Sequence, residues 1–318
     1  MTETINIDET INIDNEIEIN QQVDTDETET DENSKILNFI MKYFFPIFII
    51  NIFLISISAI VVATQTILNN GDYDKYFWLN QFIKYVLITI IQFLMAFLVS
   101  KYQIKVNYTR KAIHISYFLI PQLMDTIIIR YERNTITEIW NVWIILMLLV
   151  LLSEPVRKKI YPINYMFKAV DRPEDRPYTL IWFASQIIGG LLVIIPFSLY
   201  FNSIDKNGFT FIPILVNGLA DGLAEPICIR FGKHKYQTKS CLSSKKYTRS
   251  YEGSLCVFIV TLIITLSYYF YMSINQYIFM ALLLPPVVTV TEAFSPHTWD
   301  CPFLFFVTCS LLSASYHI

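Results

Sequence analysis

The sequence lacks the charged surface of a soluble globular protein. Only 16% of its 318 residues are charged, whereas 54% are hydrophobic and the mean hydropathy is +0.43. Several apolar runs reach the roughly 18–20 residues that are needed to cross a bilayer. The composition therefore excludes a soluble domain and predicts an all-α fold, a polytopic transmembrane helical bundle.

Cysteine pairs of the C-x-x-C type are missing as well. The chain has an odd number of cysteines, which are Cys228, Cys241, Cys256, Cys301 and Cys309. This spacing excludes a disulfide framework and a zinc site. We expect reduced thiols that lie mostly in the membrane.

Residues 1–34 contain no lysine or arginine. They hold 12 of the 27 acidic residues, so residues 35–318 keep 15 acidic and 24 basic residues, a net charge of +9. The composition predicts a disordered acidic tail at 1–34, ahead of a transmembrane catalytic domain at 35–318. A plain solvated tail is its simplest role. It has neither the basic and apolar regions of a signal peptide nor the arginine-rich character of a transit peptide, so we expect the endoplasmic reticulum.

Nine apolar runs predict about nine membrane spans. They are Tyr43–Ala63, Phe77–Ser100, Ala112–Ile129, Ile139–Ser153, Thr179–Phe201, Phe209–Ile229, Ser254–Met272, Gln276–Phe294 and Cys301–Tyr316. With a cytoplasmic N-terminus, the cytoplasmic segments 101–111, 154–178 and 230–252 hold 4, 6 and 7 basic residues. The segments on the other side hold only Lys75, Arg130, Arg133 and Lys206. The positive-inside rule thus predicts a cytoplasmic N-terminus and a lumenal C-terminus.

Two carboxylates interrupt the sixth run. Asp221 and Glu225 are four residues apart, so they lie on one helical face near the cytoplasmic end. Carboxylates in a membrane helix are costly and mark a candidate functional site, although a helix-end pair that reaches water is the simpler alternative. Mg²⁺ is usually shared between one or two carboxylates and substrate phosphates. The pair therefore predicts a site for Mg²⁺ and a polyphosphate.

Basic residues follow this acidic pair and also precede the third run. Lysines and arginines fill the predicted loop Arg230–Arg249, where they would hold phosphate charge. The alternative is a topological signal that attracts anionic lipids. Arg110 and Lys111 are likewise phosphate ligands or an interfacial anchor, and His114, one turn beyond Arg110, would handle a proton or orient a carboxylate. The charged loop 171–178 is either a solvated connector or a wall of the nucleotide site.

These motifs together resemble the polyprenol kinase family, which includes dolichol kinases, phytol kinases and CTP-dependent diacylglycerol kinases. The resemblance covers roughly residues 105–310. The matching motifs are Arg110–His114 (RKAIH), Ala220–Glu225 (ADGLAE), Arg230–Lys235 (RFGKHK) and Arg249–Ser254 (RSYEGS). The chain departs from the family pattern at Asn217, which replaces an acidic position, and at Cys301, which replaces an asparagine after Asp300.

The resemblance implies a CTP-dependent lipid kinase that phosphorylates an isoprenoid or related lipid alcohol at the cytoplasmic face. The catalytic residues implied are Asp221, Glu225 and His114. The nucleotide ligands implied are Arg110, Lys111, Lys233, Lys235, Arg249 and Glu252. The Mg²⁺ ligands implied are Asp221, Glu225 and Glu292. The expected partners are a nucleoside triphosphate, a lipid alcohol and the bilayer, and no nucleic acid.

Two other functions fit the same residues. A phosphatidate cytidylyltransferase would use the same metal, nucleotide and membrane plane, but it would release pyrophosphate. A small transporter would line an ion path with Asp221 and Glu225. A transporter should show inverted repeats with broken helices in both halves. The sequence has one broken run and only a weak counterpart at Pro285-Pro286.

Overall fold

The computed structural model describes residues 75–131, 135–239, 246–296 and 299–318. The predicted acidic tail and the first apolar run, Tyr43–Ala63, lie outside these residues. Contacts divide the chain into two units, residues 1–71 with 138–147 and residues 72–137 with 148–318. Every predicted site residue belongs to the second unit.

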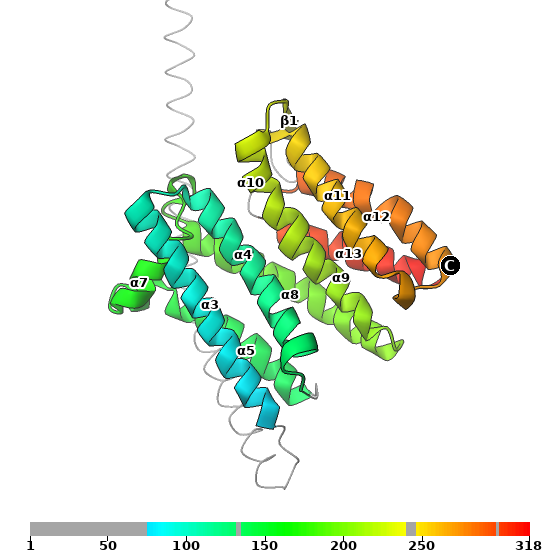
Figure 1. Cartoon of the computed structure of the whole chain (residues 1–318), viewed down its shortest axis with the longest axis horizontal. Coiled ribbons are helices and arrows are strands. Elements are labelled where there is room, and N and C mark those ends of the chain that lie inside the picture. The colour runs from blue at the N-terminus through cyan, green and yellow to red at the C-terminus, as the bar shows by residue number, and fades with distance from the viewer. Residues whose placement is uncertain (1–74, 132–134, 240–245, 297–298) are drawn as a thin grey trace, which may run out of the picture. The chain divides into compact units, whose positions relative to one another are not determined.

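The described part of the chain is mostly helical, in agreement with the predicted fold class (Figure 1). Its long helices are α3 (Lys75–Tyr102), α4 (Val106–Leu123), α5 (Thr135–Leu151), α8 (Thr179–Ser203), α11 (Tyr251–Ser267), α12 (Ile274–Phe294) and α13 (Asp300–Ser315). Shorter helical segments are the π-turn η2 (Met124–Ile128), α6 (Glu154–Arg157), α7 (Tyr161–Phe167) and the 3₁₀ turns η3 (Pro173–Asp175) and η6 (Tyr269–Tyr271). The sixth run is the continuous series η4 (Asn207–Thr210), α9 (Phe211–Leu215), η5 (Val216–Asp221) and α10 (Gly222–Phe231).

Four helices of the described part are long and apolar enough to cross a membrane. They are Tyr76–Tyr102, Thr179–Ser203, Asn207–Phe231 and Ile274–Phe294. Three further apolar helices are shorter, at Thr137–Leu151, Tyr251–Ser267 and Asp300–Ser315. The structure thus supports an integral membrane protein, and the count of nine spans remains a prediction.

The helices of the second unit pack in a series. Contacts join α3 to α4, α4 to α10, α10 to α11, α11 to α12, α12 to α13 and α13 to α8. Between them lies an apolar core that includes Phe209, Val216, Met280, Leu284 and Leu304. Many large apolar side chains face outward instead, such as Leu192 at 72% exposure. Such an apolar outer surface is expected where lipid replaces water.

A π-helical turn interrupts the sixth run where the sequence placed its acidic pair. Residues Val216–Asp221 form η5, whose extra residue per turn changes the direction of the side chains beyond it. Two glycines let this segment approach α4 closely. A Cβ at Gly218 would lie 2.6 Å from Phe118 Cβ, and a Cβ at Gly222 would lie 2.5 Å from Ile115 Cγ1.

The basic segment 230–249, predicted as a loop, instead contains a β-hairpin. Strands β1 (Lys235–Lys239) and β2 (Lys246–Ser250) pair antiparallel, with Tyr236 opposite Arg249 and Thr238 opposite Tyr247. Successive side chains of a strand point to opposite faces, so the alternation of polar and bulky residues gives this two-stranded ribbon one face that can pack on helix ends. Thr238 is buried and its hydroxyl donates to the Ala293 carbonyl at 2.8 Å, which attaches the hairpin to α12.

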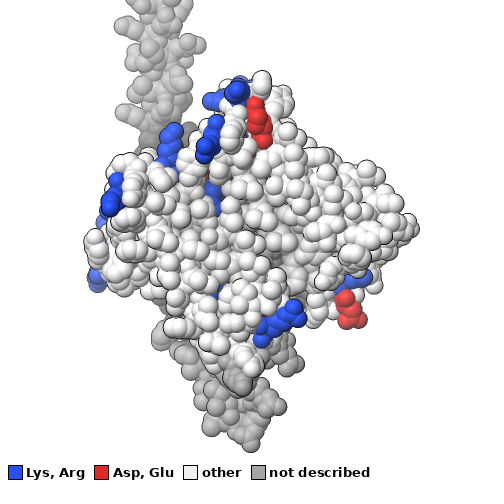
Figure 2. Space-filling model, viewed as in Figure 1, with Lys and Arg blue, Asp and Glu red and all other residues white. Residues whose placement is uncertain are grey.

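The end of the second unit where α4 begins and the hairpin lies is rich in exposed cations. We call it the basic end. It carries Lys101, Lys105, Lys158, Lys159, Lys168, Arg230, Lys233 and Lys235. Figure 2 shows several of the blue side chains gathered at this end, while the middle of the visible face is nearly uncharged. Exposed charge gathered at one end is expected of segments that project from a bilayer, and the side of the membrane on which this end lies remains a prediction.

At the opposite end, a buried ion pair holds α3 to the π-turn η2. Lys84 Nζ lies 3.0 Å from Asp125 Oδ1, and the two side chains are 4% and 6% exposed. Asn80 donates to the Ile129 carbonyl at 2.8 Å beside them. A buried ion pair is stabilising only when both partners are present, so this contact fixes the pairing of the two helices.

Candidate active site

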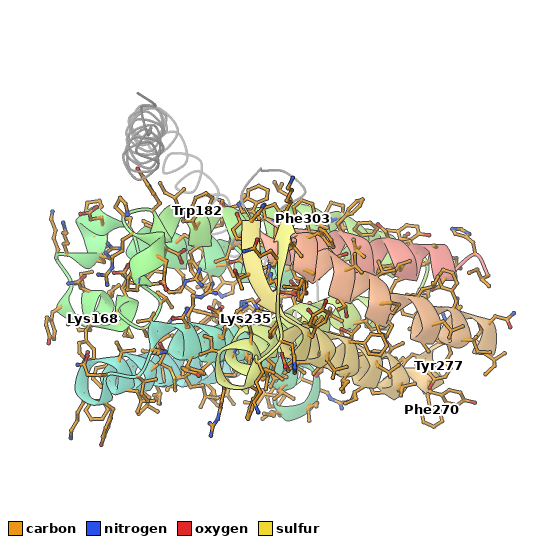
Figure 3. All side chains as sticks on the ribbon, turned by 90° about the horizontal axis from the view of Figure 1, so that it is seen from above. Lys168, Trp182, Lys235, Phe270, Tyr277 and Phe303 are labelled. Carbon is orange, nitrogen blue, oxygen red and sulfur yellow. The ribbon has the colours of Figure 1, made fainter. Side chains whose placement is uncertain are left out.

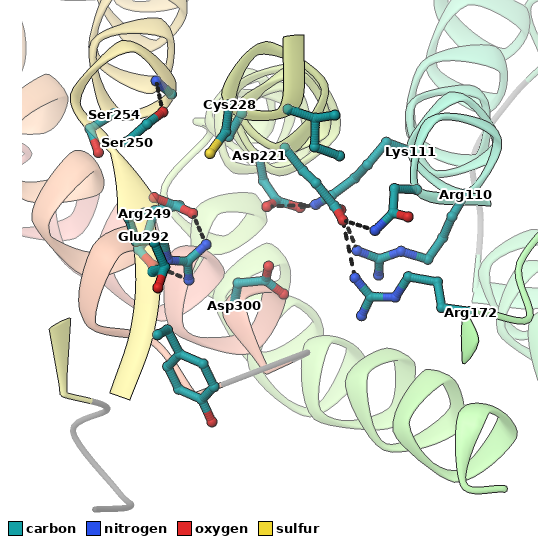
Figure 4. A pocket seen from close by; sticks show the side chains of 17 residues that line it. Arg110, Lys111, Arg172, Asp221, Cys228, Arg249, Ser250, Ser254, Glu292 and Asp300 are labelled. Atoms are coloured by element: carbon teal, nitrogen blue, oxygen red, sulfur yellow. Dashed lines mark hydrogen bonds and ion pairs between the residues drawn. The ribbon is translucent and has the colours of Figure 1, made fainter. Parts of the chain in front are cut away.

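A cavity of about 330 Å³ opens at the basic end, among the ends of α4, α10, α11, α12 and α13. Eight of its lining residues are charged, in equal numbers of each sign. The basic ones are Arg110, Lys111, Arg172 and Arg249, and the acidic ones are Asp221, Glu225, Glu292 and Asp300. Figure 4 shows them converging from both sides, with Arg249 and Glu292 opposite Lys111 and Arg110.

Asp221 lies at the end of the π-turn and pairs with α4. Lys111 Nζ lies 2.8 Å from each oxygen of its carboxylate, and the side chains are 5% and 2% exposed. His114 Nε2 lies 3.2 Å from Asp221 Oδ2 and 3.0 Å from the Asn217 carbonyl oxygen. Both neighbours are acceptors, so Nε2 carries the hydrogen. Of the two roles predicted for His114, this contact favours orientation of the carboxylate.

Glu225, one helical turn further on, is held by three donors. Arg110 Nη2 lies 2.6 Å from Oε2, while Asn107 Nδ2 and Arg172 Nη1 lie 2.8 and 3.1 Å from Oε1. Arg172 also donates through Nε to Asp175 Oδ2 at 2.7 Å and is only 5% exposed. The loop after α7 therefore reaches the acidic pair, and through Arg172 it forms part of the cavity wall.

The hairpin and α12 supply the opposite wall. Arg249 Nη1 lies 2.6 Å from Glu292 Oε1, and its Nη2 donates to the Glu292 backbone carbonyl at 3.1 Å. Next to it, Ser250 caps the N-terminus of α11, because its hydroxyl accepts from the Gly253 N–H at 3.0 Å. Gly232 caps the end of α10, and a Cβ there would clash with the Cys228 carbonyl oxygen of the same helix and lie 2.8 Å from Ser250 Oγ at the end of β2, so this position needs glycine.

Asp300 is the one lining carboxylate for which the described part of the chain provides no ion pair. Its Oδ1 accepts from Gln186 Nε2 at 2.8 Å and from the Cys301 N–H at 3.2 Å. Asp300 lines the same cavity as Asp221. Only Glu292 was among the predicted metal ligands, since the asparagine of the family pattern is missing after Asp300, yet both residues line the cavity.

Three predicted nucleotide ligands lie apart from the cavity lining. Lys233 and Lys235 are exposed at the base of the hairpin. Glu252 accepts from the His234 ring at 2.7 Å and from the His234 backbone N–H at 3.2 Å. Hydrogen bonds from its own backbone N–H and from His234 lower the pKa of the Glu252 carboxyl to about 2. In this position Glu252 holds the turn that precedes the hairpin.

Two buried donors of the cavity arginines have no partner. Arg110 Nε and Arg249 Nε are shielded from solvent, and no acceptor is found for either among the described residues. An unsatisfied buried donor costs roughly 1–3 kcal/mol, and its charge makes the arrangement more costly still. Four cations line this cavity, which opens at the basic end, and two of them have unused donors. Such an arrangement can bind a multiply charged anion.

The predicted metal ligands do not converge on one point. Asp221, Glu225 and Glu292 belong to three separate ion pairs, and no group of three or more His, Cys, Asp or Glu side chains in the described part of the chain is arranged to hold a metal. Asp221 and Asp300 nevertheless line the same cavity, and carboxylate oxygens are ligands of the kind that Mg²⁺ takes.

Sequence reasoning missed several lining residues, including Asn107, Tyr247 and Thr248, and it included Arg172 only as part of the loop 171–178. Arg172 carried one usable signal, since it precedes a proline in a loop at the basic end. Asn107, one turn before Lys111, lay on the face already assigned to phosphate. Comparison of the chain with family models, with curated proteins and with solved structures gives no match.

Proposed function

We propose that the chain is a CTP-dependent lipid kinase, which transfers the γ-phosphate to a membrane isoprenoid alcohol or a related lipid alcohol. The observation that carries the proposal is the cavity at the basic end, in which four cations and four carboxylates meet at the ends of membrane helices. Phosphoryl transfer requires mainly positioning and neutralisation of charge, and this set of residues supplies both. The choice of CTP and of an isoprenoid alcohol rests on the family resemblance.

In this proposal each charged residue has a definite part. Arg110, Lys111, Arg172 and Arg249 exchange carboxylate partners for phosphate oxygens. Asp221 and Asp300, which line the same cavity, would hold a Mg²⁺ that accompanies the nucleotide, and such an ion would neutralise charge on the phosphates. The alcohol oxygen forms a bond to the γ-phosphorus while the bond to the β-phosphate oxygen breaks. The products are a lipid phosphate and CDP, and the alcohol proton is released to a carboxylate of the cavity or to water.

The membrane arrangement that we propose puts the cavity in the cytoplasm, where nucleoside triphosphates are found. The N-terminus is then cytoplasmic, nine spans bring the C-terminus to the lumen, and the endoplasmic reticulum is the expected membrane. The gathering of exposed cations at one end supports this orientation.

The test is a transfer assay on membranes that contain the full chain. CTP labelled at the γ-phosphate is supplied with Mg²⁺ and with dolichol, phytol, geranylgeraniol or diacylglycerol. We expect label in one lipid, and its loss in Asp221→Asn. The matched control is Glu154→Gln, because Glu154 is an exposed acid at the same end, paired with Lys158 outside the cavity.

Two other outcomes would contradict the proposal. Transfer from α-labelled CTP to phosphatidate, without γ-transfer, would identify a cytidylyltransferase. No transfer from either label would favour a role without catalysis, such as transport.

A further inference from the structure

A series of aromatic rings runs from α3 to the short helix α7, which packs beside it (Figure 1). Phe97 and Phe93 lie one turn apart on α3, and the Phe93 ring centre lies 5.3 Å from that of Tyr165 on α7. The Tyr165 ring in turn stacks on Tyr161 at 6.2 Å. Phe97, Phe93 and Tyr161 are 36%, 50% and 77% exposed, so these rings face outward. We call the four residues the aromatic strip.

Two lysines flank the aromatic strip. Lys101 Nζ lies 5.3 Å from the centre of the Phe97 ring, and Lys168 Nζ lies 5.5 Å from the centre of the Tyr165 ring. Both lysines are exposed, and neither has an ion-pair partner among the residues that the structure describes. Figure 3 shows Lys168 at the outer edge of the helices. This face therefore carries positive charge that an anion from outside the protein can neutralise.

The length of α3 sets the depth of the strip in a bilayer. Tyr76–Tyr102 has 27 residues and is therefore about 40 Å long, which matches a bilayer together with its headgroups. Lys101 then lies at the level of the headgroups. Phe97 and Phe93 lie about 8 and 14 Å below Tyr102, at the boundary with the hydrocarbon and inside it. The face thus presents a cation to the headgroups and rings to the first carbons of the acyl chains.

The segment that contains α7 is basic as well. Residues 154–168 hold four cations and a single acid, Glu154, which pairs with Lys158. Arg157 lies over the Phe167 ring at 3.7 Å. A basic segment with aromatic side chains at headgroup depth is typical of surfaces that attract anionic lipids. A zwitterionic lipid would bring a further cation next to the lysines, so the charge favours a headgroup that is negative overall.

We propose that the aromatic strip, with Lys101 and Lys168, is a binding site for an anionic phospholipid in the leaflet that the basic end meets. The two lysines bind the negative headgroup, and the rings contact the glycerol backbone and the first carbons of the acyl chains. The site belongs to α3 and α7 and shares no residue with the charged cavity, so it does not rest on the kinase function.

The first experiment measures binding by photo-cross-linking. The full chain in phosphatidylcholine vesicles receives a small fraction of phosphatidylserine or phosphatidylcholine with a diazirine near the glycerol end of one acyl chain, and labelled peptides are identified by mass spectrometry. We expect the serine lipid to label residues 93–102 and 161–168 about tenfold more than the choline lipid does. Excess phosphatidylserine should remove this label, and soluble glycerophosphoserine should not. Equal labelling by the two lipids, or removal by the soluble headgroup, would overturn the proposal.

The second experiment separates this site from a general attraction to negative membranes. Lys101→Gln with Lys168→Gln should lower the preference for phosphatidylserine about tenfold, to near equality with the choline lipid. Both lysines are exposed and unpaired among the described residues, so the unfolding temperature should not change. Lys158→Gln with Lys159→Gln is the matched control, because it removes two exposed charges from the same end and leaves the strip intact. An equal loss in both double variants would overturn the site.

Discussion

At the scale of single residues, Lys111 and Asp221 form the most deeply buried ion pair in the charged cavity. Removing one partner leaves the other as an uncompensated buried charge, which costs roughly 3–5 kcal/mol. We predict that Lys111→Met and Asp221→Asn each lower the unfolding temperature strongly. The double variant should lose clearly less than the sum of the two, and none of the three should transfer phosphate. Additive losses in thermal unfolding of the purified protein would contradict the pairing.

Arg172 is a second residue whose role can be isolated. It donates to both Glu225 and Asp175, and a lysine cannot reproduce this planar double contact. Arg172→Lys should therefore raise the KM for the nucleotide about tenfold with a smaller change in the KM for lipid. Arg176→Lys is the matched control, because Arg176 pairs with Asp171 at 58% exposure. If the two variants behave alike in the transfer assay, Arg172 has no direct role at the nucleotide site.

At the scale of elements, two glycines set the distance between α4 and the sixth run. An added Cβ would clash with Ile115 at Gly222 and with Phe118 at Gly218. Overpacking of this kind typically costs roughly 1–3 kcal/mol. We predict that Gly222→Ala and Gly218→Ala lower thermal stability and activity together. Gly208→Ala is the control, since its nearest neighbour, Tyr271 Cδ1, lies at an ordinary 3.5 Å. Unchanged stability in both test variants would refute the close approach.

The turn before the hairpin should depend on pH through Glu252. The pKa of this carboxyl lies at about 2 instead of the ordinary 4.5, so its stabilising effect is complete above pH 4.5 and disappears as the pH falls through about 2. We predict that Glu252→Gln speeds amide hydrogen exchange of residues 232–236 at pH 7, after correction for intrinsic rates. The wild-type protein should approach the variant as the pH falls toward 2. A difference that persists unchanged at pH 2 would contradict this assignment.

At the scale of the whole molecule, the orientation in the membrane can be tested with cysteine substitutions. In a background without the native cysteines, Lys158→Cys at the basic end should react with an impermeant maleimide from the cytoplasmic side. Lys206→Cys, on the short connection between α8 and the sixth run, should react only from the lumenal side. Labelling of both positions from one side would contradict the proposed topology.

Much of this arrangement was predictable from the sequence. Composition indicated a helical membrane protein, and the apolar runs match α3, α8, α12 and α13 to within two residues at each end. Asp221 and Glu225 line one cavity, as their spacing predicted. The main error was to predict a loop where the structure has a hairpin. Short polar strands leave little hydrophobic pattern in the sequence, and these two strands form because helix ends cover one face of the hairpin.

Hydropathy and charge are local properties, and they were enough to indicate an integral membrane protein, the positions of several of its helices and which end is basic. Only the tertiary structure decided which charges meet. Lys111 and Asp221 are 110 residues apart along the chain, and Arg110 and its partner Glu225 are 115 residues apart. A side chain's partner depends on how helices pack around the π-turn and its glycines, and a pattern of single residues along the chain does not encode that geometry.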